Sequence, residues 1–186
     1  MKYLIAFTLL IATLSLQGQN IERRGFVIGL GIGGGIINIQ DSGAESTLDE
    51  TDGTLSLPNL QMGFMLSDRT ALLASIPGAI YKYDGRDRSF EAFIPSVQHW
   101  VSDNWWVRGG VGLAMDMPAL YDIKDLDDPE FNIGYAMAAS TGFELVQRGS
   151  FALDLQGRIQ YGRAYLDNDA HRDGLIMTVG LGFTWY

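Results

Sequence analysis

The sequence predicts an all-β protein, an antiparallel up-and-down transmembrane β-barrel of about eight strands that follows an N-terminal signal peptide. Three observations lead to this prediction. Long rows of bulky apolar side chains recur with a period of two, which is the spacing of residues on one face of a strand. The alternate rows consist mainly of Gly, Ala and Ser, with a few charged residues. Short and long connections alternate along the chain, so all long loops would lie at one end of the barrel.

The composition limits the class of protein. The chain has 186 residues, enough for one domain, and its charged fraction of 19% lies below the level of about 25% that is usual for a soluble domain. A net charge of -9 argues against a nucleic-acid partner, because binding to phosphates needs clustered Lys and Arg. Cysteine is absent, which excludes disulfides, thiolate metal sites and a lipid anchor on Cys.

The N-terminus has the three-part pattern of a secretory signal peptide. Met1–Lys2 gives a positive start, residues 3–16 are apolar apart from Thr and Ser, and Gln17–Gln19 is small and polar. The apolar run is shorter than the roughly 20 residues of a transmembrane helix. We therefore predict a signal peptide over residues 1–19 and a barrel domain over residues 20–186, with a buried N-terminal helix as the alternative.

The final strand, residues 174–186, shows the period of two most clearly. Its bulky row is Leu175, Met177, Val179, Leu181, Phe183 and Trp185. The alternate row is Thr178, Gly180, Gly182 and Thr184. A strand with one long apolar face needs a partner on each edge and an apolar environment for that face.

Four further strands are expected earlier in the chain, over residues 25–39, 54–66, 70–83 and 89–101. Pro58 indicates a break or bulge in the second of them, and Pro77-Gly78 an irregularity in the third. In the fourth, the outward row is Phe93, Pro95, Val97, His99 and Val101. The opposite register, through Phe90, Ile94 and Trp100, remains open at this point.

Three more strands are expected over residues 105–115, 131–145 and 151–161. Short connections are predicted near Asp68, Asp103 and Arg148, and longer ones near Asp49, Arg86, Asp125 and Asn168. The interior of a barrel with about eight strands is just wide enough for side chains, so the bulky apolar rows are expected to face outward. Such rows are tolerated only in lipid, where a closed barrel also satisfies every backbone N–H and C=O.

Aromatic residues gather near the ends of the expected strands. At the short-turn end these are Trp100, Trp105, Trp106, Phe151, Trp185 and Tyr186, and toward the long-loop end Tyr81, Tyr83, Tyr121, Phe131 and Tyr165. Aromatic side chains favour the two membrane–water interfaces. The distribution therefore predicts two aromatic girdles.

Taken together, these features resemble the small outer-membrane β-barrel proteins of Gram-negative bacteria (porin-like, OmpA/OmpX type). The resemblance lies in Leu175–Tyr186, in Trp105–Met115 and in the hairpin over residues 97–110. It implies an outer-membrane location, with membrane lipid as a partner and with the C-terminal strand read by the barrel-assembly machinery. In that family the last residue usually lies in phase with the outward row, whereas here Trp185 is in phase and Tyr186 is not.

Several polar side chains fall on the rows that should face the lumen. They are Gln98, Arg108, Glu144, Asp154, Gln156, Arg158 and Gln160. Charges in a low-dielectric interior are expected to pair. We interpret this set as a structural network that fills the lumen, which predicts a structural or interaction role. The alternative is a small passive diffusion channel.

No catalytic, cofactor-binding or metal-binding residue is predicted, and the chain is not expected to be an enzyme, with an outer-membrane hydrolase as the less favoured alternative. His99 falls at the short-turn end, and His171 in a loop among acidic residues has no recognisable serine partner. The glycine run between Gly29 and Gly35 lies inside an alternating strand and lacks the following helix of a phosphate-binding loop.

The expected long loops are acidic. Asp125–Asp128 and Asp167–Asp169 offer oxygen ligands, but their spacing fits no complete calcium loop, so we interpret them as a solvated rim. Residues 41–52 and 117–130 are candidates for adhesion or for binding an extracellular ligand that the sequence does not identify.

Overall fold

A computed structural model describes residues 22–43, 49–121 and 129–186. The predicted signal peptide lies outside the described residues. The strands are β1 (Phe26–Ser42), β2 (Asp49–Ser67), β3 (Thr70–Ile76), β4 (Gly78–Tyr83), β5 (Arg86–Trp100), β6 (Trp105–Pro118), β7 (Asn132–Arg148), β8 (Phe151–Tyr165) and β9 (His171–Trp185). No helix that could cross a membrane occurs in the described parts of the chain.

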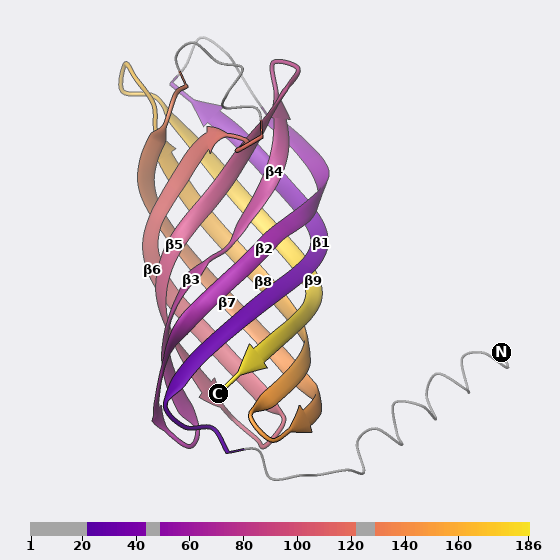
Figure 1. Cartoon of the computed structure of the whole chain (residues 1–186). Helices are drawn as coiled ribbons and strands as arrows, with labels where there is room; N and C mark the ends of the chain where they lie inside the picture. Colours follow the sequence, from indigo (N-terminus) through magenta and orange to yellow (C-terminus); the bar gives the residue numbers. More distant parts are fainter. Residues whose placement is uncertain (1–21, 44–48, 122–128) are drawn as a thin grey trace, which may run out of the picture.

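The strands form one closed antiparallel barrel (Figure 1). β1 pairs with both β2 and β9, which closes the sheet on itself. β3 and β4 together fill a single place between β2 and β5, so the ring has eight positions, as predicted. Several strands extend beyond the expected bounds at the long-loop end, because backbone pairing continues where the apolar rows have stopped.

The connections are divided between the two ends of the barrel. The turns after β2, β5 and β7 lie at the end that also holds the C-terminus (Figure 1). The prediction of a longer loop near Arg86 is wrong, since only Asp84 and Gly85 join β4 to β5. Both have positive φ, 50° and 73°. Two such residues in succession form the tight hairpin turn that matches the twist of paired strands.

Two predicted irregularities are confirmed, and two others were not foreseen. The β1–β2 register shifts between Gly31 and Gly33, opposite the segment that contains Pro58. Pro77 separates β3 from β4 and accepts a hydrogen bond from the Ala92 N–H at 2.9 Å. Proline lacks an N–H and cannot donate a backbone hydrogen bond to the neighbouring strand. Each of these two interruptions therefore falls at a proline. The unforeseen shifts lie in β2, between Met65 and Ser67, and in β7, between Glu144 and Val146.

Bulky apolar side chains cover the outside of the barrel. Exposed members from six strands include Ile28, Ile32, Phe64, Leu72, Phe93, Val97, Val111, Leu113, Val179 and Leu181. The register predicted for the fourth strand is confirmed, because Phe93 and Val97 face out while Phe90, Ile94 and Trp100 are buried. An apolar outer surface that surrounds the barrel is the surface of a protein embedded in lipid.

The interior is less uniformly small than the sequence suggested. Two buried apolar clusters occupy it, one with Ile37, Ile39, Tyr81, Phe90, Ile94 and Ile176, the other with Val27, Leu73, Trp100 and Trp106. Glycines opposite the large rings make the room. A Cβ at Gly162 or Gly174 would lie 2.7 or 2.8 Å from the ring of Phe90. The small residues therefore complement the large ones across the lumen.

Gly174→Ala should lower the free energy of unfolding by about 1–3 kcal/mol, because the added methyl overpacks the Phe90 site. The matched control is Gly109→Ala, since a Cβ at Gly109 would meet nothing within 4 Å, and its change should stay within about 0.5 kcal/mol. Urea unfolding of the protein in lipid vesicles measures both. Equal effects of the two substitutions would contradict the tight packing around Phe90.

The two aromatic girdles are confirmed only in part. Trp105 and Trp185 are exposed at the short-turn end, and Phe131 and Tyr165 toward the long-loop end. Trp100, Trp106 and Tyr81, which were assigned to the girdles, are instead buried in the lumen. The position of a residue along its strand sets the depth of its side chain along the barrel. Whether the residue belongs to the outward or the inward row sets the direction of its side chain.

Candidate functional site

The lumen holds all seven polar residues that the sequence placed there. Gln98, Arg108, Glu144, Asp154 and Gln160 are buried, and Gln156 and Arg158 are half-buried. They do not form one network. Glu144 belongs to a cluster at the short-turn end, a second cluster that the sequence did not reveal lies toward the long-loop end, and Arg108 and Arg158 lie apart from both.

Glu144 is the centre of the cluster at the short-turn end. Its Oε2 lies 2.6 Å from the Arg23 guanidinium and accepts a hydrogen bond from Gln147 Nε2 at 2.5 Å. Its Oε1 accepts bonds from Trp100 Nε1 at 2.8 Å and from the Tyr186 hydroxyl at 2.9 Å. This one carboxylate thus connects the segment before β1, strands β5 and β7 and the last residue of the chain.

Arg23 is buried at this end of the barrel. It also donates to the Asp103 carbonyl at 2.6 Å and lies over the Trp100 ring, with its guanidinium carbon 4.7 Å from the ring centroid. Sequence reasoning assigned Arg23 no role, because it precedes the first alternating row. One sequence signal pointed to this cluster, because Tyr186 does not belong to the outward row. Its side chain points inward, and its hydroxyl donates a hydrogen bond to Glu144.

Asp116 is the centre of the second cluster. It accepts hydrogen bonds from Arg88 at 2.9 and 3.2 Å, from Arg172 Nη1 at 3.0 Å and from the Tyr81 hydroxyl at 2.6 Å. Arg172 also makes a bidentate pair with Asp41, at 2.6 and 2.7 Å. Arg88, Arg172 and Asp41 had been assigned to loops, so their inward phase was not considered. Two arginines, two carboxylates and a phenol thus fill the lumen toward the long-loop end.

The middle of the lumen contains two arginines with polar but uncharged partners. Arg108 donates to Ser140 Oγ at 3.1 Å and to Gln61 Oε1. Arg158 donates to Ser56 Oγ at 3.4 Å. Among the described residues, neither guanidinium has a carboxylate within 4.0 Å. In the two end clusters, by contrast, each arginine has a carboxylate within this distance.

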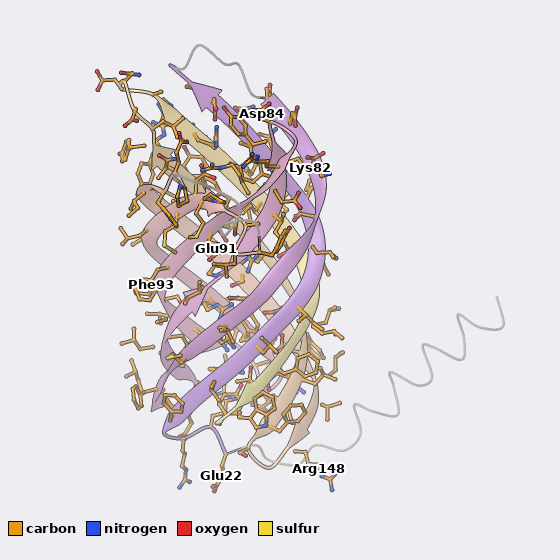
Figure 2. The ribbon with its side chains drawn as sticks, turned by 45° about the horizontal axis from the view of Figure 1, so that its top comes forward. Glu22, Lys82, Asp84, Glu91, Phe93 and Arg148 are labelled. Carbon is orange, nitrogen blue, oxygen red and sulfur yellow. The ribbon has the colours of Figure 1, made fainter. Side chains whose placement is uncertain are left out.

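The barrel wall has a gap between β2 and β4. The two strands share one backbone pair, Ser56 with Ala79. Beyond it the Thr54 side chain replaces the ladder, donating to the Ile80 carbonyl at 2.8 Å and accepting from the Ile80 N–H at 3.2 Å. A groove of about 350 Å³ lies here, lined by Asp52, Gly53, Thr54, Leu55, Ile80, Tyr81, Lys82 and Asp87. Figure 2 shows Lys82 and Asp84 toward the long-loop end, opposite Glu22 and Arg148.

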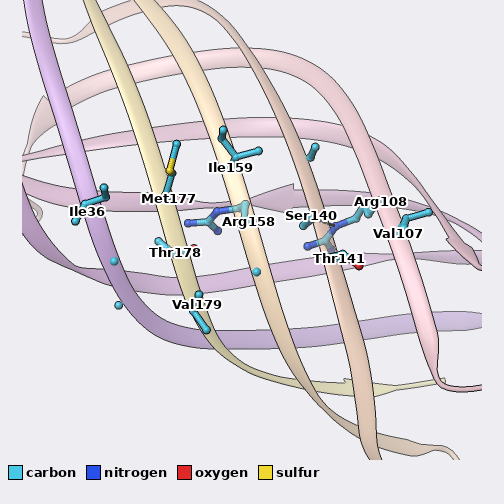
Figure 3. Close-up of a pocket in the computed structure, with 14 residues that line it drawn as sticks. Ile36, Val107, Arg108, Ser140, Thr141, Arg158, Ile159, Met177, Thr178 and Val179 are labelled. Atoms are coloured by element: carbon cyan, nitrogen blue, oxygen red, sulfur yellow. Dashed lines mark hydrogen bonds between the residues drawn. The ribbon is translucent and has the colours of Figure 1, made fainter.

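A broad depression of about 650 Å³ extends across β1, β9, β8, β7 and β6 (Figure 3). Its lining is mainly apolar and includes Ile36, Val107, Ile159 and Met177 from the outward rows. Gly157 and Ala139 are small outward residues that leave this space open. The depression therefore offers an apolar recess of the outer surface to a lipid acyl chain.

Neither histidine completes a catalytic arrangement in the described parts of the chain. His99 faces outward from β5, with its Nδ1 3.1 Å from Thr70 Oγ1. His171 begins β9 rather than lying in a loop, and its Nε2 is 3.8 Å from Asp173. No group of three His, Asp or Glu residues gathers as a metal site within the described ranges, and Asp125–Asp128 lie outside them.

An eight-position closed barrel with an apolar outer surface and a lumen filled by side chains defines a small transmembrane β-barrel protein. Scans of the sequence against protein families and against curated proteins found no match. Solved structures are similar in fold. Neisserial surface protein A matches with a TM-score of 0.54 at 15% identity, covering 87% of this chain and 96% of that one.

Two further structures agree. Ail, the attachment invasion locus protein of Yersinia pestis, has a TM-score of 0.53 at 11% identity, covering 86% of this chain and 99% of Ail. The outer membrane protein AlkL, determined in DMPC bilayers, has a TM-score of 0.50 at 13% identity, covering 91% and 93%. The predicted fold, a small up-and-down antiparallel β-barrel with eight strand positions, is confirmed.

Proposed function

We propose that this chain is an outer-membrane protein with a structural or interaction role and a closed lumen. The observation that carries the proposal is the pair of buried ionic clusters, around Glu144 at one end and Asp116 at the other. Each cluster joins several strands through charge-assisted hydrogen bonds, which are about twice as strong as neutral ones. Side chains held in this way obstruct a continuous path for water and ions.

In this proposal the long-loop end carries the interaction. The sequence places acidic segments there, over residues 41–52 and 117–130, and Ail, which is similar in fold, is an attachment invasion locus protein. Membrane lipid surrounds the outward rows, and the barrel-assembly machinery engages the C-terminal strand during insertion. The extracellular ligand is a separate protein or surface that tolerates an acidic rim. The expectation that the chain is not an enzyme remains a prediction.

Purified protein in planar lipid bilayers should produce no reproducible ion steps, because both ends of the lumen are closed. The double variant Arg23→Ala/Asp116→Ala removes one member of each cluster and should produce steps if it inserts, which provides the positive control. Regular steps from the unmodified protein would contradict the closed lumen and favour the channel alternative.

A passive channel is the second candidate, and the gap between β2 and β4 is the observation that favours it. Its groove connects outward Leu55 with inward Tyr81, so a small solute could pass through the wall rather than along the axis. Gly53→Phe would fill the groove, whereas Gly109→Phe adds the same ring on the open outer face. Liposome swelling that is slowed by the first variant and not by the second would support the channel.

A further inference from the structure

We propose that the lumen binds one small monovalent anion, a halide such as chloride, beside the Arg158 guanidinium. The inference goes beyond the proposed function, since it requires neither ion flow nor a partner. It rests on three observations, which are an uncompensated charge, a buried donor without a partner, and a small cavity beside them.

The first observation is the charge of Arg158. Three other inward arginines each have a carboxylate close by, at 2.6 Å for Arg23, 2.9 Å for Arg88 and 2.6 Å for Arg172. Arg158 has none within 4.0 Å among the described residues, and it donates a hydrogen bond to the neutral Ser56 hydroxyl at 3.4 Å. Arginine does not lose its proton in a protein, so this charge persists.

The neighbouring charges do not balance it. The guanidinium of Arg108 acts on Arg158 with the same sign, and Asp154 is the carboxylate that acts on Arg108. Two cations and one anion thus occupy the described middle of the lumen. A buried charge without a counter-charge is costly, and a bound anion would neutralise it where a water molecule would not.

The second observation is that Arg158 has an unused hydrogen-bond donor. Its Nε is buried without a hydrogen-bond partner. Figure 3 shows the Arg158 head group beside Thr178, whereas that of Arg108 lies beside Ser140. Arg158 therefore has a free N–H donor that takes no part in the hydrogen bonds of Arg108.

The third observation is a small, partly enclosed cavity of about 10 Å³ at this place, lined by Gly31, Ile32, Ser56, Asn59, Gln156, Arg158, Thr178 and Gly180. A space of about this size holds one water-sized particle. Hydroxyl and amide N–H groups on its wall can donate to an anion, and no carboxylate lines it. The size excludes phosphate and larger anions, which leaves a halide.

Thermal unfolding of the folded protein in detergent tests the site. At equal ionic strength, sodium chloride or bromide should raise the unfolding midpoint by a few degrees relative to sodium gluconate, and the rise should saturate. Arg158→Gln should abolish the difference, because it removes the charge and keeps a polar side chain. Arg163→Gln is the matched control, since Arg163 already pairs with Asp173 at 2.7 Å, and it should keep the halide effect.

A structural readout covers the case in which Arg158→Gln does not fold. Crystals of the unmodified protein grown in bromide should show an anomalous peak beside the Arg158 guanidinium. Equal midpoints in gluconate and bromide, or a site occupied by water without anomalous signal, would overturn the proposal. Bilayer conductance tests the closed lumen separately, so failure of one proposal is distinguishable from failure of the other.

Discussion

Glu144→Gln should lower the free energy of unfolding by about 3–5 kcal/mol, because it removes one partner of a buried ion pair and leaves the other charge uncompensated. Glu144 is 1% exposed, and the Arg23 guanidinium lies 2.6 Å from its carboxylate. The substitution keeps the size of the side chain, so the decrease in the free energy of unfolding measures the effect of removing the charge. Urea unfolding in lipid vesicles, followed by the change in gel mobility on heating, measures it.

The matched control for this prediction is Asp103→Asn. It breaks the 3.1 Å pair with Arg69, whose two side chains are largely exposed, and should cost at most about 1 kcal/mol. The double variant Glu144→Gln/Arg23→Gln should recover part of the stability, since it also removes the orphaned cation. If Glu144→Gln costs no more than Asp103→Asn, the Glu144 cluster does not stabilise the barrel.

Val179→Arg is the second substitution with a large expected effect. Val179 lies midway along β9 on the outward row and is 63% exposed to the surroundings of the barrel. An arginine on the lipid face near the bilayer centre costs about 2–4 kcal/mol. The same change at an exposed position in water would stay within about 0.5 kcal/mol. Unfolding in lipid vesicles should therefore show the larger loss.

Leu120→Arg is the appropriate control for the lipid-face substitution. Leu120 is 75% exposed but lies beyond the end of β6, in the connection to β7. Its replacement should change stability little, because the new charge remains in water. Indistinguishable effects at positions 179 and 120 would mean that the outward rows of the barrel do not contact hydrocarbon.

Local periodicity was sufficient to predict the barrel and the direction of most side chains. Residues 174–186 and 105–115 alternate so regularly that their faces follow from phase alone. The extent of the strands did not follow, since Arg88 and Arg172 belong to paired backbone without an apolar row beside them. Backbone pairing depends on the neighbouring strand, which local sequence does not identify.

Contacts across the lumen were also beyond prediction from the sequence. Phe90 packs against Gly162 and Gly174, which come from β8 and β9. Arg23 and Glu144 are 121 residues apart in the chain. The alternation along each strand predicts that these side chains point inward. Which of them come into contact depends on how all the strands of the barrel are staggered against one another. The sequence could therefore predict that inward charges form pairs, but it could not predict which residues pair.

The central claim is that the bulky outward rows contact acyl chains while the inward aromatic residues do not. Quenching of tryptophan fluorescence by lipids brominated on their acyl chains tests it most directly, because Trp105 and Trp185 face out and Trp100 and Trp106 are buried in the lumen. Brominated vesicles should quench the unmodified protein strongly, and the double variant Trp105→Phe/Trp185→Phe should lose most of that quenching. Quenching that persists undiminished in the double variant, or is absent from the unmodified protein, would contradict the account.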